Sequence, residues 1–202
     1  MLDAHAHIGD INHKDGLVCS ATPEEVPTGY RFNSIGLIPC AGTFDIGKLE
    51  LYASKGYMIG EIGLDRRYPD LDRQLSLFKS ILSIARTYDR FVTIHMVGCQ
   101  EAIYDAIKES KIRTFLLHGY TGSVEMARRF ISIGGLISIN PRAEKAKSFP
   151  DLLKLPFVTE TDMEMGEIQN KTLTAWNEKL SQLTGFDVQE VSERRLLERI
   201  YV

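Results

Sequence analysis

The chain has little cysteine, no long apolar run and no excess of charge of one sign. Its three cysteines, Cys19, Cys40 and Cys99, are odd in number and lack Cys-x-x-Cys spacing, which indicates reduced thiols of an intracellular protein. No stretch approaches the roughly 18 apolar residues of a membrane span. The first residues also lack a charged region followed by an apolar one. We therefore expect a cytoplasmic protein that does not enter a membrane.

The composition is that of an ordinary soluble globular protein, with 44% hydrophobic and 25% charged residues. A formal net charge of −3 gives no overall basic character, so any contact with nucleic acid must be local. A chain of 202 residues is long enough for one domain with a proper core, and we expect a single domain over 1–202. The sequence does not indicate an oligomeric state.

Short apolar runs recur along the chain and predict eight strands. Several are rich in Ile, Val, Leu and Phe without clean alternation, which is typical of parallel strands covered on both faces. Helical patterns separate the later runs, whereas residues 22–29 leave room for barely two helical turns. The expected strands lie at 1–8, 16–20, 33–39, 57–62, 91–95, 113–118, 135–139 and 156–160.

The clearest helical pattern is an apolar stripe of Leu71, Leu75, Phe78 and Leu82, spaced by four, three and four residues. Further helices are expected at about 100–109, 168–183 and 187–200. Alternating strands and helices, with eight strands, predict an α/β fold: a compact (β/α)8 TIM barrel with shortened early helices. Such barrels usually need about 250 residues, and about 200 is their lower limit.

Four histidines and two acids fall at the ends of the expected strands. Two of the histidines are separated by one residue, so on a strand both imidazoles point to the same face. TIM barrels carry their active sites at the carboxyl ends of the strands, so we expect all six side chains to converge. We interpret His13, in a polar loop, as a surface residue. The six candidates are His5, His7, Glu61, His95, His118 and Asp162.

Imidazoles and carboxylates in this number predict a centre of two divalent metal ions. We expect His5, His7 and Asp162 to hold one ion, with Glu61 reaching it. His95 and His118 then hold the second, with Glu61 as the bridge. Two ions about 3.5–4 Å apart share a water, lower its pKa and polarise the phosphoryl or carbonyl oxygen under attack. Mixed ligands of this kind accept Zn, Mn, Mg or Ni.

Two of these residues are also expected to be catalytic. Asp162 is a competent base for the proton of the attacking water, because a carboxylate beside the metal accepts protons. Glu61 is expected to take part in catalysis as the carboxylate that bridges the two ions.

At these residues the chain resembles the TatD family of metal-dependent deoxyribonucleases, which are amidohydrolase-like metal hydrolases. The resemblance covers nearly the whole chain. It implies a TIM barrel that hydrolyses phosphodiesters of DNA with Mg, Mn or Zn, so DNA ends or short oligonucleotides are the expected substrates. The matching motifs are Asp-Ala-His-Ala-His (3–7), Gly-Glu-Ile-Gly-Leu-Asp (60–65), Ile-His (94–95), His-Gly-Tyr-Thr-Gly (118–122) and Glu-Thr-Asp (160–162).

The chain departs from this family pattern at two apolar positions. Where family members usually carry Gly-x-His-Pro after strand three, this chain has Gly-Leu-Ile-Pro, so Ile38 replaces the histidine. Family members usually carry an arginine two positions after the strand-five histidine, where this chain has Val97. Both lost groups are expected to face a phosphate.

A basic rim after strand seven is the best candidate to compensate for these losses. It consists of Arg142, Lys145 and Lys147, and Arg142 is the expected substrate-binding residue. Arg66, at the mouth of strand four, is a weaker candidate for the same role.

Two rival functions remain open. The first is a small-molecule or acyl (amide or ester) hydrolase with the same binuclear metal centre, which the apolar Ile38 and Val97 favour. The second is a non-catalytic homologue that binds metal or a partner, against which the six intact ligands argue.

The double variant Ile38→His with Val97→Arg tests whether these two positions weaken phosphate binding. Each lost charge-assisted hydrogen bond is worth about 1.5–3 kcal/mol, so the pair amounts to about 100-fold or more. We expect the double variant to degrade single-stranded DNA faster than wild type, with no gain on a small ester. Family-typical DNA cleavage by wild type, unchanged in the variant, would contradict this expectation.

Overall fold

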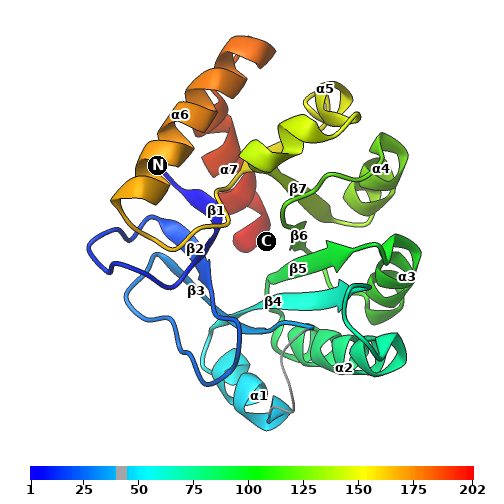
Figure 1. Ribbon diagram of the computed structural model, residues 1–202. Helices are drawn as coiled ribbons and strands as arrows, with labels where there is room; N and C mark the ends of the chain where they lie inside the picture. Colours follow the sequence, from blue (N-terminus) through cyan, green and yellow to red (C-terminus); the bar gives the residue numbers. More distant parts are fainter. Residues whose placement is uncertain (40–44) are drawn as a thin grey trace.

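A computed structural model describes residues 1–39 and 45–202. It contains eight strands in one sheet, ordered β1 to β8, and each pairs in parallel with the next. The strands form the ring seen in Figure 1. They are β1 (Asp3–His7), β2 (Gly16–Cys19), β3 (Phe32–Leu37), β4 (Met58–Asp65), β5 (Val92–Val97), β6 (Phe115–Leu117), β7 (Gly135–Ile139) and β8 (Phe157–Thr159).

The ring closes between β1 and the segment that follows β8. The amide of Asp162 donates to the carbonyl of His5 at 3.1 Å, and the amide of Met165 donates to the carbonyl of His7 at 3.0 Å. The amide of His7 in turn donates to the carbonyl of Met163 at 2.8 Å. These bonds pair the main-chain groups on the free edge of β1 with those of the segment after β8. The predicted TIM barrel is therefore confirmed, as a nearly closed barrel.

Helices follow the later strands and pack outside the ring. The first two connections, 8–15 and 20–31, contain no helix. The early helices, which the sequence predicts to be short, are therefore absent from these two connections. Between β7 and β8 the chain forms only a 3-10 helix and one short α-helix. The helices are α1 (Ile46–Ser54), α2 (Leu71–Tyr88), α3 (Gln100–Ser110), α4 (Val124–Ser132), η1 (Pro141–Lys145), α5 (Phe149–Leu152), α6 (Glu167–Thr184) and α7 (Val188–Ile200).

Helix α2 shows how the local sequence sets an element. The side chain of Asp70 accepts from the amide of Arg73 and caps the helix. Phe78 and Leu82 of the predicted stripe are buried against the sheet, whereas Leu71 is exposed. The stripe therefore begins one turn later than predicted.

Two apolar layers lie on the two faces of the strands. Phe115 of β6 packs in one cluster with Phe130 of α4, outside the ring. Leu116, which points the opposite way, belongs to a second cluster with Leu17 and with Leu196 of α7. Figure 1 shows α7 behind the strands, with the carboxyl terminus inside the outline of the ring. Apolar side chains thus fill the end of the barrel that α7 covers.

Strands β4 and β5 are longer than the sequence predicted. Gly63 pairs with His95, and Asp65 pairs with Val97, beyond the expected strand ends. Glu61 and His95 therefore lie within their strands instead of at the ends. Gly63, with φ 153°, allows this pairing, because a Cβ there would come 1.9 Å from the carbonyl oxygen of His95.

The structure describes two of the three cysteines. Cys19 is a buried free thiol and Cys99 a half-buried one, and Cys40 lies outside the described residues. Within 1–39 and 45–202, no helix has the length and apolar character to cross a bilayer.

Replacing Gly63 with alanine should lower the free energy of unfolding by about 2 kcal/mol or more. The new Cβ adds a clash with β5 to the strain of a positive φ, and each effect costs about 1–3 kcal/mol. Chemical denaturation measures the loss. Gly56→Ala is the control, because its φ is 100° but no atom lies within 4 Å of the added Cβ. Equal losses in the two variants would show that β5 does not constrain Gly63.

Candidate metal centre

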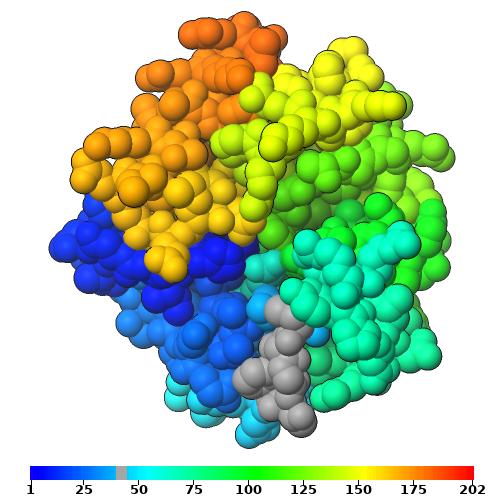
Figure 2. Space-filling model, in the orientation of Figure 1, coloured from blue at the N-terminus to red at the C-terminus, as the bar shows by residue number. Residues whose placement is uncertain are grey.

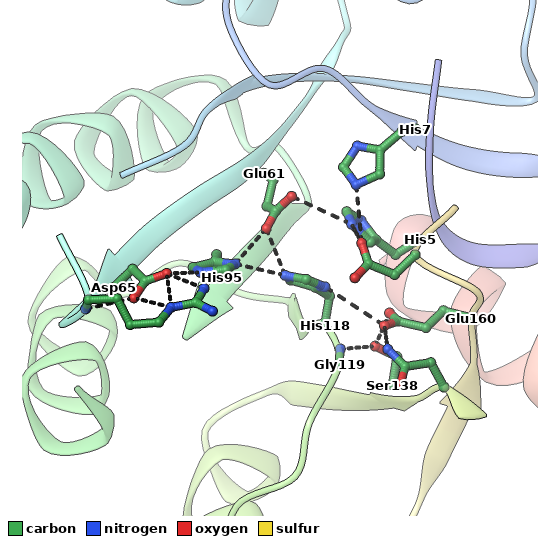
Figure 3. A network of polar contacts seen from close by, with 12 residues as sticks. His5, His7, Glu61, Asp65, His95, His118, Gly119, Ser138 and Glu160 are labelled. Atoms are coloured by element: carbon green, nitrogen blue, oxygen red, sulfur yellow. Dashed lines mark hydrogen bonds and ion pairs between the residues drawn. The ribbon is translucent and has the colours of Figure 1, made fainter. Parts of the chain in front are cut away.

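The six predicted side chains meet at one end of the barrel. Figure 3 shows the four histidines gathered around Glu61. Its Oε1 lies 2.6 Å from Nδ1 of His95 and 2.7 Å from Nε2 of His118. Its Oε2 lies 3.6 Å from Nε2 of His5. One carboxylate from β4 therefore reaches histidines from β1, from β5 and from the residue after β6.

Asp162 forms the second meeting point. Its Oδ1 lies 3.3 Å from Nε2 of His5 and 3.1 Å from Nε2 of His7. The two imidazoles lie edge to face, with ring centroids 5.0 Å apart, as the spacing on β1 predicted. The main-chain bonds that close the barrel bring Asp162 to this position.

The cluster is buried on one side and open on the other. His5 is fully buried, and the side chains of Glu61 and His118 are 7% exposed. His7 has 32% of its side chain exposed and His95 has 18%. Figure 2 shows the segments in dark blue, green and cyan meeting near the centre of one face. Solvent therefore reaches the cluster from the side of His7 and His95.

Opposite charges shift the pKa values of these groups. Burial opposes ionisation of Glu61, but His118 and the other facing imidazoles hold its pKa well below the usual range. Burial of His118 disfavours its protonation, yet Glu61 and Glu160 raise its pKa well above the ordinary value. The hydrogen bond with Asp162 likewise raises the pKa of His7. The acids are ionised, and the site favours positive charge between them.

The residues fit a divalent metal. Three sets of ligand atoms each lie within 4.8 Å of one another: those of His5, His7 and Glu61, of His5, His118 and Asp162, and of Glu61, His95 and His118. Both ring nitrogens of His5 are buried and lack a hydrogen-bond partner within the described residues. Buried polar atoms are rarely left unpaired, and a cation would satisfy Nε2, the nitrogen that faces Glu61 and Asp162. The first and third sets agree with the two-ion arrangement that we predict.

Sequence reasoning missed Asp65, which supports His95 from behind. It is the last residue of β4 and almost fully buried, and its Oδ2 lies 3.1 Å from Nε2 of His95. Hydrogen bonds from Arg67 and His95 outweigh burial and lower the pKa of Asp65 to about 2. A carboxylate on the outer nitrogen of a histidine fixes which nitrogen is free to bind metal. In the sequence, Asp65 could have been identified from its place at the end of the motif Gly-Glu-Ile-Gly-Leu-Asp.

Glu160 lies behind His118, at a longer distance than that of Asp65 from His95, and was also missed. It is fully buried, accepts from Asn140 at 2.9 Å and from the Ser138 hydroxyl, and has Oε1 3.7 Å from Nδ1 of His118. Asn140 also accepts from the amide of Arg142 at 3.1 Å. Glu160 therefore links the histidine cluster to the segment that carries Arg142. It begins the motif Glu-Thr-Asp, which signalled Asp162 alone.

Asp3, a third missed acid, joins β1 to the residues after β8. It accepts from the Thr161 hydroxyl and from Gln169 of α6, both at 2.6 Å. Burial outweighs these bonds and raises its pKa to about 7. Asp3 thus holds His5 and Asp162 in neighbouring positions through the backbone.

The two predicted substrate-binding arginines differ in their positions. The guanidinium of Arg142 contacts Oδ2 of Asp162, while 66% of its side chain stays exposed. Arg66 is also exposed, but its side chain runs over Gly98. No ion pair joins Arg66 to the cluster within the described part of the chain.

His13 and Trp176 lie outside the cluster. His13, which we expect at the surface, is half-buried, with Nδ1 2.6 Å from the side-chain amide of Asn170. Trp176 is buried, and its indole N–H donates to the carbonyl of Ile139 at 2.9 Å, so its role is in packing.

A TIM barrel with histidines and carboxylates gathered at one end is typical of metal-dependent hydrolases. Residues 28–196 match the family model described as TatD related DNase. The chain belongs to this TatD family.

Several known proteins are similar to this chain. An uncharacterized metal-dependent hydrolase of Methanocaldococcus jannaschii is 29% identical, over 95% of this chain and 92% of the relative. The uncharacterized metal-dependent hydrolase YjjV of Escherichia coli is 33% identical, over 56% of this chain and 48% of its own length. The crystal structure of YjjV, a TatD homologue, superposes with a TM-score of 0.81 at 21% identity, covering 100% of this chain and 96% of that one. This likeness shows the shared fold.

Metal binding should stabilise the protein through these ligands. After treatment with EDTA, Mn²⁺ at 100 times its Kd adds about 2.7 kcal/mol of stability, which raises Tm by about 5–10 °C. Thermal melting measures the shift. His5→Gln should remove most of it, because His5 belongs to two of the three ligand sets. His13→Gln is the matched control and should keep the full shift; its loss there would place the metal elsewhere.

Proposed function

We propose that the protein is a phosphodiesterase that hydrolyses DNA ends or short oligonucleotides with two divalent metal ions. The family membership supports hydrolysis, and the observation that supports phosphate as the target is Arg142. Its exposed guanidinium lies directly beside Asp162. Arginine binds phosphate through paired, charge-assisted hydrogen bonds. Arg142 thus supplies a cation that Ile38 and Val97 do not.

Each ligand has a defined part in this proposal. His5, His7 and Asp162 would hold one ion, His95 and His118 would hold the second, and Glu61 would reach both. Bound divalent ions polarise a phosphoryl oxygen and lower the pKa of water. Asp65 keeps His95 in the required orientation through a hydrogen bond, and the carboxylate of Glu160 faces the other nitrogen of His118.

Hydrolysis forms a bond from the water oxygen to phosphorus and breaks the bond from phosphorus to the sugar oxygen. Asp162 accepts the proton of the water. Burial raises the pKa of this carboxyl group, but contacts with His5 and His7 hold it well below the usual range, so it is ionised before the water binds. The leaving oxygen takes a proton from solvent. Arg142 neutralises negative charge on the phosphoryl oxygens during the step.

The rival function is hydrolysis of an acyl ester or amide at the same centre. Ile38 and Val97 are half-buried and apolar, which favours a substrate with an uncharged group beside the scissile bond. The rim at Arg142 favours phosphate instead. Assays of metal-loaded protein with a short single-stranded oligonucleotide, bis(p-nitrophenyl) phosphate and p-nitrophenyl acetate separate the two. Turnover of the acetate alone would contradict the phosphodiesterase proposal.

Asp162→Asn should lower kcat by at least about 100-fold, because the amide cannot accept the proton. Asparagine tolerates the left-handed backbone of this position, where φ is 58°, so the variant should fold. Activity is measured at saturating metal, and circular dichroism reports the fold. A folded variant with near-native kcat would show that Asp162 is not the base.

A further inference from the structure

We propose that Arg67 binds the phosphate next to the scissile one, so that the site prefers substrates with at least two consecutive phosphates. This inference rests on the proposed phosphodiesterase function and narrows its substrate class to oligonucleotides.

Arg67 is a fixed and exposed cation. Its Nε lies 2.9 Å from Oδ1 and 3.1 Å from Oδ2 of Asp65, and its Nη2 lies 2.5 Å from Oδ2. Its amide also donates to Oδ1 at 2.9 Å. Even so, 64% of the Arg67 side chain is exposed, while Asp65 is 1% exposed. A guanidinium anchored in this way loses little further conformational freedom when it binds an anion.

The anchor places this cation next to the ligand cluster. The oxygen of Asp65 that contacts Nη2 of Arg67 also lies 3.1 Å from Nε2 of His95. The other ring nitrogen of His95 faces Glu61 at 2.6 Å. One carboxylate oxygen and one imidazole therefore separate Arg67 from the centre of the cluster.

Arg142 repeats this arrangement on the other side. It contacts Asp162, which lies 3.1 Å from Nε2 of His7. Figure 3 shows Asp65 and His7 on opposite sides of Glu61. The cluster thus lies between two carboxylate-anchored guanidiniums, each about two-thirds exposed.

One phosphodiester does not need cations on both sides of the cluster. A nucleic acid strand carries one negative charge per nucleotide, so consecutive phosphates present anions at regular intervals. Arg142 lies beside the proposed base and is therefore assigned to the scissile phosphate. Arg67, beyond His95, is assigned to the neighbouring phosphate.

The test compares Arg67→Gln with wild type on two substrates. A short oligothymidylate carries several phosphates, whereas bis(p-nitrophenyl) phosphate carries one. We expect KM for the oligothymidylate to rise at least 10-fold more than KM for bis(p-nitrophenyl) phosphate, because any effect that passes through Asp65 and His95 falls on both substrates alike. The Kd of the oligothymidylate for EDTA-treated protein, measured by fluorescence anisotropy, should rise by a similar factor. Arg67→Lys should recover part of the loss.

Arg113→Gln is the matched control. Arg113 is exposed and paired with a carboxylate, Asp89, at 3.1 Å, but it precedes the start of β6, at the other end of the strand from His118. Arg113→Gln removes one positive charge, as Arg67→Gln does, and should leave the kinetic constants for both substrates unchanged.

Two results would overturn the assignment of Arg67. Equal losses on both substrates would show that Arg67 acts only through Asp65 and His95, and no loss on either would show that it has no part. Failure of wild type on both phosphodiesters, with turnover of p-nitrophenyl acetate, would instead contradict the phosphodiesterase proposal itself.

Discussion

The site depends on one buried carboxylate. Glu61 lies in the middle of β4, nearly without solvent, and a charge in that position is costly unless opposite charge or strong hydrogen bonds surround it. His5, His95 and His118 supply those contacts. They come from three other parts of the barrel wall, so the closed parallel sheet is what lets one carboxylate meet all three.

Charge alternates outward from Glu61. The histidines around it are backed by further acids, Asp65 behind His95 and Glu160 behind His118. Outside the acids, guanidiniums at the rim contact Asp65 and Asp162. The acids contact the imidazoles, and the outer cations stay exposed. In the proposed function, metal binding and binding of an anionic substrate therefore depend on the same carboxylates.

Much of this arrangement could be predicted from the sequence. Apolar runs located all eight strands, and the rule that barrel sites lie at strand carboxyl ends predicted that the six candidate ligands lie close together. The sequence pattern gave the wrong end for β4 and missed two acids, because tertiary contacts determine both. Gly63 and Asp65 resemble the end of a strand, yet β4 continues because Gly63 admits β5 closely and Asp65 is satisfied by His95 and Arg67. Asp65 and Glu160 were missed because their role is visible only beside the histidine that each contacts.

We infer that these residues hold two divalent ions. Diffraction from crystals grown with Mn²⁺, measured at the manganese absorption edge, tests this inference. We expect two anomalous peaks within the cluster, with Glu61 next to both. A single peak would refute the binuclear centre, and peaks remote from His5, Glu61 and Asp162 would contradict the metal assignment as a whole.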